Sequence, residues 1–266
     1  MRRFVEETGS TNADMLALAE QGAPEGTWLR AGRQTGGRGR RGRSWESPDG
    51  NLYCSTLVQL GPNDPAAHTL ALVAANAVHA LVAPLCCRTS APAEAGAQGG
   101  GRAGQPWTPA FAGVRGGDGP GQTKIKWPND VLVDGAKIAG ILLERLGDAI
   151  VVGIGVNVTG HPTGLDRPAT SLAAQGATDA EAGALLERLA QLFGHWLGIW
   201  RAQGLEPVRT HWLLNAHPAG TPMRVALPDG AVVEGAFDTL DRDGMLILRL
   251  ANGDSRAIHA GDIILT

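Results

Sequence analysis

The sequence predicts an α+β protein in which a large domain of helices and strands, residues 1–218, precedes a small antiparallel β-barrel, residues 219–266. Two observations lead to this prediction. Segments with helical spacing of apolar residues alternate with strand-like segments over most of the chain. From about Gly220 the pattern changes to short strands separated by turn dipeptides, which is typical of a small barrel: Asp229-Gly230, Asp243-Gly244 and Asn252-Gly253.

The elements of the first part of the large domain follow from periodicity and from capping signals. A strand begins at Phe4, and Thr11-Asn12-Ala13-Asp14 resembles a capping box that opens a helix. Asp64-Pro65 predicts a second helix start, because Asp caps well and Pro suits the first helical position. The expected elements are a helix over Asn12–Glu20, a Gly- and Arg-rich loop over Ala31–Trp45, a strand over Asn51–Leu60 and a helix from Asp64 that ends at Pro84.

The segment Arg88–Thr123 differs in composition from its neighbours. It is rich in Gly, Pro and Ala, contains no Leu or Ile, and shows neither a helical nor a strand period. Such a segment cannot bury enough apolar surface to offset the entropy of ordering it. We therefore expect a disordered insertion between a helix and a strand. Trp107 and Phe111 are its large apolar groups, and the alternative is that they dock locally or bind a partner.

Regular structure is expected to resume after this insertion. Asp134-Gly135 is a hairpin turn signal, and Thr178-Asp179-Ala180-Glu181 resembles a second capping box before a long amphipathic helix. The aromatic residues of that helix have the spacing of core residues rather than of a cofactor site. The strands expected here and in the barrel are Lys124–Trp127, Val131–Val133, Lys137–Leu146, Ala149–Asn157, Met223–Leu227 and Met245–Leu250.

The composition argues against several classes of protein. The net charge of −3 gives no overall attraction to nucleic acid, so we expect no DNA partner. The sequence shows no run of about 18 apolar residues and no signal peptide, so we expect no membrane association. The three cysteines include the adjacent pair Cys86 and Cys87, which makes a poor disulfide framework. We therefore expect a cytoplasmic protein.

The loop Gly37–Arg43 alternates glycine with arginine. Glycine lets the backbone approach a ligand closely, and guanidinium groups bind phosphate or carboxylate through paired hydrogen bonds. A flexible basic loop of an RNA-binding segment is an equally good interpretation when this motif is taken alone. The loop lacks the Gly-Lys-Ser/Thr of a Walker loop and does not fit the dinucleotide-binding pattern.

Three further motifs carry polar residues at strand ends or glycines within a strand. In Lys126-Trp127-Pro128-Asn129-Asp130, Pro128 forces a sharp exit from a strand, and an ordinary turn is the alternative. Lys137 stands at the start of a very apolar strand, where it is either an exposed charge or a phosphate-binding cation. Gly153-Ile154-Gly155-Val156-Asn157 has glycines within a strand, which indicates a closely approaching ligand or a bulge.

In this order the motifs resemble the biotin–protein ligase family: Ser10-Thr11-Asn12, Gln34 with the arginine loop and Trp45, Lys-Trp-Pro-Asn-Asp, Lys137–Glu144 and Gly153–Asn157. The resemblance covers Phe4 to Asn157 for the motifs and extends more loosely to the C-terminus. It implies a mixed β-sheet catalytic domain, similar to class II aminoacyl-tRNA synthetases, followed by a small SH3-like β-barrel. Some members carry an N-terminal DNA-binding domain. Because the motifs here begin at Phe4, we expect a short form without repressor function.

The resemblance also implies roles for individual residues. Lys137 and Arg38 would be catalytic, meeting the carboxylate and the α-phosphate. The biotin-binding residues would be Ser10, Thr11, Gln34, Arg38, Arg40, Lys137, Gly140, Gly153 and Gly155, with Arg40 closing over biotin and the last two glycines letting its rings lie against the strand. The ATP- or adenylate-binding residues would be Arg40, Arg41, Arg43, Trp45, Asn129, Asp130, Lys137 and Asn157, with Asp130 near Mg²⁺.

The implied activity is ATP-dependent conversion of biotin to biotinyl-5′-AMP and transfer of biotin to a lysine of a biotin carboxyl carrier protein. ATP with Mg²⁺ and biotin would be substrates, no prosthetic group is needed, and a homodimer is one possible assembly. The alternatives are a lipoate or octanoate ligase or transferase on the same fold, a nucleic-acid-binding module that uses the arginine loop, and an inactive interaction protein. Retention of the polar motif residues argues against the last of these.

Overall fold

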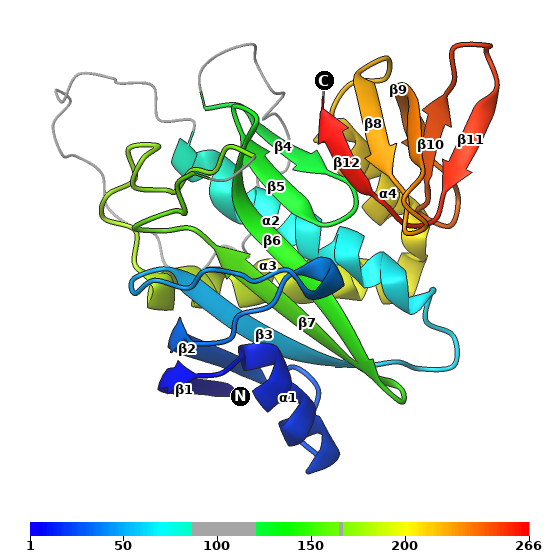
Figure 1. Cartoon of the computed structure of the whole chain (residues 1–266). Helices are drawn as coiled ribbons and strands as arrows, with labels where there is room; N and C mark the ends of the chain where they lie inside the picture. The colour runs from blue at the N-terminus through cyan, green and yellow to red at the C-terminus, as the bar shows by residue number, and fades with distance from the viewer. Residues whose placement is uncertain (87–120, 165–166, 266) are drawn as a thin grey trace, which may run out of the picture.

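The computed structural model describes residues 1–86, 121–164 and 167–265. A seven-stranded sheet forms the centre of the large domain (Figure 1). Its first two strands are parallel, and every other neighbouring pair is antiparallel. In spatial order the strands are β1 (Arg2–Thr8), β2 (Trp28–Gln34), β3 (Leu52–Gln59), β7 (Ala149–Val156), β6 (Ala136–Leu146), β5 (Asp130–Val133) and β4 (Thr123–Lys126).

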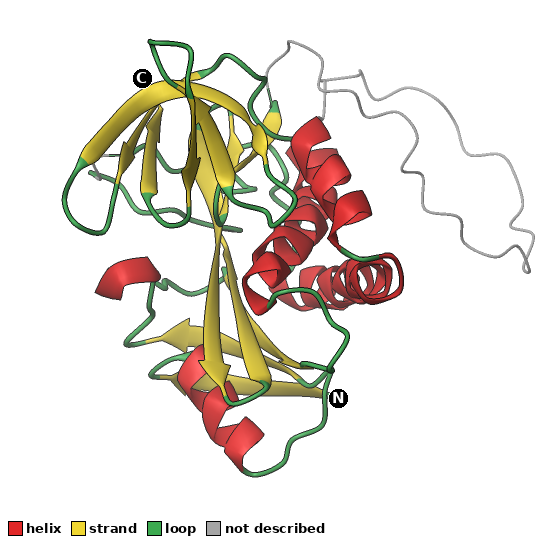
Figure 2. Ribbon diagram, turned by 90° about the vertical axis from the view of Figure 1, so that its right-hand side faces the viewer, coloured by secondary structure: helices red, strands yellow, loops and turns green. Residues whose placement is uncertain are grey.

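Helices cover both faces of this sheet because its strands are apolar on both sides. Val58 packs in the larger core with helices α2 (Leu70–Cys86) and α3 (Ala182–Gln203). The preceding residue, Leu57, packs instead with Met15 of helix α1 (Thr11–Glu20). Successive strand residues point to opposite faces, so α1 lies across the sheet from the helical layer. The two layers are separate in Figure 2.

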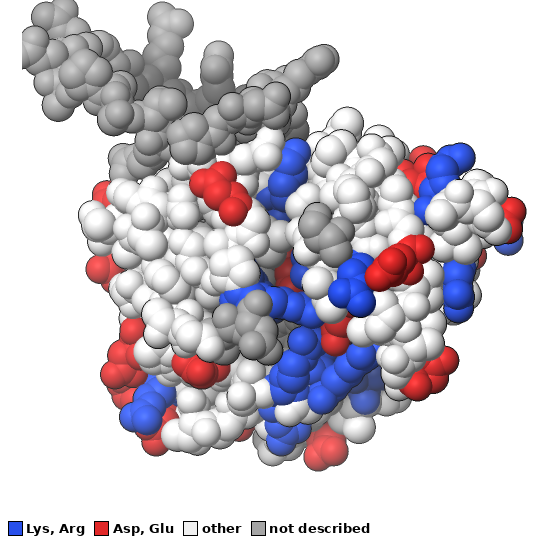
Figure 3. Space-filling model, turned by 45° about the horizontal axis from the view of Figure 1, so that its top comes forward, with Lys and Arg blue, Asp and Glu red and all other residues white. Residues whose placement is uncertain are grey.

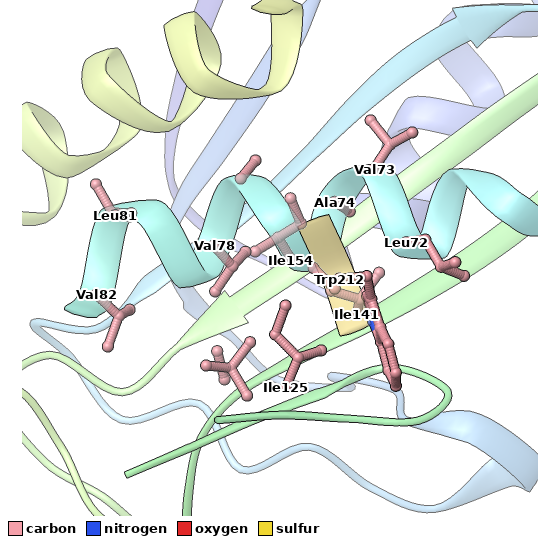
Figure 4. Packing of buried hydrophobic residues seen from close by; sticks show 14 of the residues in the cluster. Leu72, Val73, Ala74, Val78, Leu81, Val82, Ile125, Ile141, Ile154 and Trp212 are labelled. Atoms are coloured by element: carbon pink, nitrogen blue, oxygen red, sulfur yellow. The ribbon is translucent and has the colours of Figure 1, made fainter. Parts of the chain in front are cut away.

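The larger core is built around α2. Its side chains pack with Ile125, Ile141 and Ile154 of the sheet and with Trp212 of helix α4 (Leu205–Leu214) (Figure 4). The segment Ala67–Cys86 is apolar and long enough to pass a composition test for a membrane span, which the sequence analysis did not identify. Of its most apolar 18-residue window, 78% is buried inside the protein, as in the core helix of a folded domain.

A five-stranded antiparallel sheet forms the C-terminal part of the chain. It packs against the large domain through Trp212 and Phe237, whose rings are 6.5 Å apart, and Trp127 Nε1 donates a hydrogen bond to the Gly244 carbonyl. The spatial order of the strands is β11 (Ser255–Ile258), β10 (Leu246–Arg249), β9 (Val232–Leu240), β8 (Pro222–Ala226) and β12 (Asp262–Leu265).

Several predicted boundaries were wrong. Strand β2 continues to Gln34, through the first residues of the expected loop, because it pairs with β1 up to that residue. Helix α2 begins at Leu70 after the 3₁₀ turn Ala67–Thr69, since Asp64 accepts the Gly61 amide in a local turn instead of capping a helix. Pro84 lies inside the helix, and Thr123, assigned to the insertion, is the first residue of β4. Residues 87–120 lie outside the described part.

Both predicted capping boxes were also wrong. Ser10 is the N-cap of α1 and Glu181 that of α3, and neither side chain caps its helix. Asp14 accepts the Thr8 hydroxyl at 2.6 Å instead of reaching back to the helix start. Helix α4 had not been predicted, although Val208 and Trp212 have the i, i+4 spacing of a buried helical face.

Candidate functional site

A chain of polar side chains links the start of α1 to the arginine loop. Gln34 Oε1 accepts hydrogen bonds from the Thr11 amide at 2.9 Å and from the Thr11 hydroxyl at 3.1 Å. Gln34 Nε2 donates to Ser47 Oγ at 3.1 Å, and Ser47 donates to the Trp45 carbonyl. Thr11 and the neighbouring Ser10 are buried. The structure therefore brings together the predicted biotin-binding residues of α1 and β2.

The same chain continues onto the sheet through residues that the sequence analysis did not assign. Ser55 of β3 lies 2.8 Å from the Thr11 hydroxyl and donates to Asn12 Oδ1 at 2.6 Å. Asn12 Nδ2 in turn donates to Glu144 Oε2 at 2.7 Å. Asn12 and Glu144 both lie within the motifs identified in the sequence, but the sequence did not predict that the two side chains contact each other.

The glycines of the sheet face are covered by two side chains. A Cβ atom at Gly153 would collide with the Asn12 carboxamide. A Cβ atom at Gly155 would lie 2.7 Å from the Trp45 ring, and one at Gly140 would lie 2.8 Å from it. Asn12 and the Trp45 indole therefore occupy the space that the three glycines leave, which was predicted to accommodate biotin.

Trp45 also meets the predicted catalytic lysine. Lys137 Nζ lies 5.1 Å from the centroid of the Trp45 ring, within cation–π range. The indole Nε1 of Trp45 is buried without a hydrogen-bond partner among the described residues. A buried unsatisfied donor costs free energy, so an acceptor on a ligand would be stabilised there.

Lys137 and Asp130 form a short charge pair in the site. Lys137 Nζ lies 2.7 Å from Asp130 Oδ1, and the two side chains are 31% and 13% exposed. The pair is short because β5 and β6 bring the Lys-Trp-Pro-Asn-Asp motif next to Lys137, with Asp130 opposite Gly140 in the register. The two motifs are thus adjacent in space, as their predicted roles require.

Two predicted nucleotide-binding amides already bond to the backbone. Asn129 Nδ2 donates to the Ile141 carbonyl at 2.7 Å. Asn157 Nδ2 donates to the Thr170 carbonyl at 2.9 Å and lies 3.5 Å from the Lys137 carbonyl. These hydrogen bonds fix the strand that carries Lys137, so both amides position the site without a bound nucleotide.

The arginine loop is held by the C-terminal sheet. Asp262 of β12, which is 15% exposed, lies 2.8 Å from Arg43, 3.3 Å from Arg41 and 3.7 Å from Arg40. Arg40 Nη1 also donates to the Gly261 carbonyl at 3.2 Å. Burial lowers the pKa of Arg40, and the charge of Asp262 opposes that shift. Arg38 is exposed and does not share this carboxylate contact.

A buried lysine is a further cation that the sequence analysis left without a role. Lys126 is 6% exposed, and burial lowers its pKa to about 8, while Asp130 and Asp262 act in the opposite direction. Its position in the Lys-Trp-Pro-Asn-Asp motif was the available signal. Lys and Arg side chains gather in a hollow at the centre of the face that Figure 3 shows. The arrangement suits a ligand with several negative charges.

The predicted magnesium region has one carboxylate, Asp130, and that carboxylate contacts Lys137. No cluster of three or more His, Cys, Asp or Glu residues that could hold a metal occurs in the described part of the chain. Mg²⁺ typically binds through one or two carboxylates together with substrate phosphates. The residues present therefore fit an ion that arrives with a nucleotide, and do not form a complete protein cage for one.

Comparison with known proteins agrees with this geometry. The model of the biotin/lipoate A/B protein ligase family matches residues 4–159, a second model of that description matches residues 119–214, and the biotin protein ligase C-terminal domain matches residues 220–266. The biotin–[acetyl-CoA-carboxylase] ligase of Paracoccus denitrificans is 34% identical over 92% of this chain and 93% of its own length. The Mycobacterium tuberculosis enzyme of the same name is 33% identical over 98% of this chain and 87% of its own length.

Solved structures show the same fold. The biotin protein ligase of Aquifex aeolicus in complex with biotin and ATP superposes with a TM-score of 0.74 at 23% identity, covering 100% of this chain and 98% of the other. The Leishmania major biotin protein ligase in complex with biotinyl-5-AMP superposes with a TM-score of 0.62 at 24% identity, covering 97% of this chain and 98% of the other. The predicted fold class, a mixed sheet followed by a small antiparallel sheet domain, is confirmed. The chain belongs to the biotin/lipoate A/B protein ligase family.

Proposed function

We propose that this chain uses ATP to activate biotin as biotinyl-5′-AMP and then transfers biotin to a lysine of a biotin carboxyl carrier protein. The observation that carries the proposal is the meeting of Lys137, the arginine loop and the Thr11–Gln34 hydrogen bonds at one part of the sheet. The full-length likeness to the two bacterial ligases supports biotin as the acid.

In the first step a carboxylate oxygen of biotin attacks the α-phosphorus of ATP and pyrophosphate leaves. Two anions must approach each other, so fixed cations lower the barrier by offsetting both the repulsion and the charge that develops. Lys137 is held at the sheet by its own strand and by Asp130, so it is preorganised for this task. Arg38 is exposed on the neighbouring loop and supplies the second cation. Asp130 would help to hold a Mg²⁺ ion that arrives with ATP, and such an ion would supply further positive charge to offset the phosphates.

In the second step the acceptor lysine amine attacks the acyl carbon of biotinyl-5′-AMP, an amide forms and AMP leaves. Water must be excluded until then, because the intermediate is a mixed anhydride. Arg40, Arg41 and Arg43 are positioned for this by Asp262. The loop would thus close over the adenylate while its arginines bind the phosphate.

The proposal is tested by biotin-dependent exchange of labelled pyrophosphate into ATP, with lipoate and octanoate in parallel. Exchange with biotin alone is expected. Lys137→Met should lower the rate about 100- to 1000-fold, the effect of removing one group that stabilises transition-state charge. Arg224→Gln, which removes an exposed cation paired with Glu234 in the C-terminal sheet, is the control and should keep the wild-type rate. Exchange with lipoate or octanoate and not with biotin would refute the assignment.

Arg40 provides a second test, directed at retention of the intermediate. Its contacts with Gly261 and Asp262 anchor the loop to the C-terminal sheet. Arg40→Gly should therefore release biotinyl-5′-AMP and label lysines of a bystander protein such as serum albumin. Unchanged selectivity for the carrier protein would contradict the role of this arginine.

A further inference from the structure

Glu144 lies at one end of the hydrogen-bond chain of the site, and its side-chain partner in the described part of the protein is Asn12 rather than one of the residues expected to contact biotin. It reaches them through Asn12, Ser55 and Thr11. We propose that Glu144 is a positioning residue that sets the direction of this chain, and thereby makes the paired hydroxyls of Ser55 and Thr11 acceptors for an N–H group of the acid substrate. The inference rests on the proposed function and names what selects a cyclic urea such as that of biotin.

The Glu144 carboxylate fixes the orientation of the Asn12 amide. An ionised carboxylate can only accept hydrogen bonds, so the Asn12 atom that lies 2.7 Å from Glu144 Oε2 must be the donor Nδ2. The Leu142 carbonyl, 3.4 Å away, is a second acceptor for Nδ2. Asn12 Oδ1 must therefore point the other way, where it lies 2.6 Å from Ser55 Oγ. Since Oδ1 only accepts, the single hydroxyl hydrogen of Ser55 is used here.

Gln34 fixes the opposite end of the hydrogen-bond chain. The Thr11 backbone amide donates to Gln34 Oε1 at 2.9 Å, and a backbone N–H can never be an acceptor. Gln34 therefore also presents a fixed acceptor to the site. The Thr11 hydroxyl lies 3.1 Å from the same oxygen and donates its only hydrogen to it.

The hydrogen-bond chain has one hydrogen fewer than it has contacts between oxygen atoms. The oxygen pairs Asn12–Ser55, Ser55–Thr11 and Thr11–Gln34 are all within hydrogen-bond distance. Each needs a hydrogen, but Ser55 and Thr11 carry only one apiece, and both are committed to the ends. The two hydroxyl oxygens therefore face each other at 2.8 Å with unshared lone pairs. A donor from outside the chain completes the network.

Burial makes this arrangement selective. Ser55 is fully buried and Thr11 is 4% exposed, so bulk water does not stabilise the lone pairs. A site built around an unmet hydrogen-bond requirement rejects a ligand that cannot meet it more strongly than an apolar pocket rejects a wrong shape. A cyclic urea carries N–H groups next to a compact ring, whereas octanoate has none and lipoate has only a disulfide ring. The chain thus discriminates against the rival acids of this fold.

Reversing the direction of the chain is the sharpest test. In Glu144→Lys the new side chain can only donate, so Asn12 must turn its Oδ1 towards it and its Nδ2 towards Ser55. Both hydroxyl hydrogens then satisfy the Ser55–Thr11 and Thr11–Gln34 contacts. Each hydroxyl oxygen now accepts one of the internal hydrogen bonds, so it has only one lone pair free for a ligand and the chain no longer requires an outside donor. Calorimetric titration should show biotin binding weakened about 10- to 100-fold, or about 1.4–2.8 kcal/mol. Adding Asn12→Asp restores an acceptor towards Ser55 and should recover most of the affinity.

The matched control is Asp148→Lys, the same charge reversal at an exposed residue of the turn after β6 whose neighbour is Arg145. It should bind biotin like the wild type. The inference is overturned if Glu144→Lys binds biotin normally, if it lowers adenylation of biotin and octanoate equally, or if Asn12→Asp fails to recover binding.

A measurement on the wild type covers the case in which Glu144→Lys does not fold. Biotin methylated at its ureido nitrogens should bind at least tenfold more weakly than biotin itself, and equal binding would overturn the inference. A wild-type protein that binds lipoate or octanoate but not biotin would refute the proposed function as well. A wild type that binds biotin, together with an unaffected Glu144→Lys variant, would refute only the role of Glu144.

Discussion

Replacing Asp262 by asparagine should release the arginine loop from the C-terminal sheet. An exposed ion pair contributes about 0.2–1 kcal/mol. The contacts of Asp262 with Arg40 and Arg41 are at the weak end of this range because they are 3.7 Å and 3.3 Å long. The 2.8 Å contact with Arg43 is stronger, but that arginine is 51% exposed. Together they amount to about 1.5 kcal/mol, which corresponds to a roughly tenfold larger open population of the loop.

Limited proteolysis measures that population, because trypsin cleaves after arginine and its rate follows the open fraction when opening is fast. Cleavage within Arg38–Arg43 should be about tenfold faster in Asp262→Asn than in the wild type, as estimated from the ion pairs. Asp238→Asn is the control, since it breaks the exposed ion pair with Arg249 in the same sheet. Equal cleavage rates in the wild type and Asp262→Asn would refute the reasoning.

Three further predictions concern stability. Burial lowers the pKa of Lys126 from 10.5 to about 8, so the unfolded chain binds more protons between pH 8 and 10.5 and the stability of the fold increases with pH over that range. Lys126→Met should raise Tm at pH 7 and abolish this increase of stability with pH. A calorimetric profile of Tm against pH that is the same as that of the wild type would contradict the prediction. Burial lowers the pKa of His79 from 6.5 to about 4, so the free energy of unfolding should decrease as the pH falls from 6.5 to 4. Urea titration should show a smaller decrease for His79→Gln than for the wild type. Gly153→Ala should cost about 1–3 kcal/mol by overpacking against Asn12, while Gly198→Ala, with open space around it, should not.

Local sequence patterns predicted much of the sheet. The hairpin signal Asp134-Gly135 does join β5 to β6, and both residues have positive φ there. The turns at Gly230, Gly244 and Gly253 likewise have positive φ and separate strands of the C-terminal sheet. These elements are local, because a tight turn restricts φ wherever it occurs, and so sequence alone identifies them.

The contacts that complete the site were not predictable in the same way. The glycines were expected to allow a close approach by a ligand or to mark a bulge, and the sequence did not indicate that Asn12, far away in the chain, lies over Gly153. That contact depends on α1 packing over the paired strands β3 and β7, where Ser55 faces Gly153. Nothing in the local sequence around Asp262 indicates that it would meet three arginines. Motif order located the site, and tertiary packing decided which side chains fill it.

The anchor of the arginine loop has a consequence for the order of events during synthesis. Arg43 and Asp262 are separated by 219 positions in the chain, and the carboxylate belongs to the last strand of the fold described here. Domains generally begin to fold from the N-terminal side while translation continues. The sheet that carries Lys137 is therefore complete well before the loop acquires its anchor. A nascent chain that stops short of β12 would hold the cations without the means of enclosing a reactive intermediate.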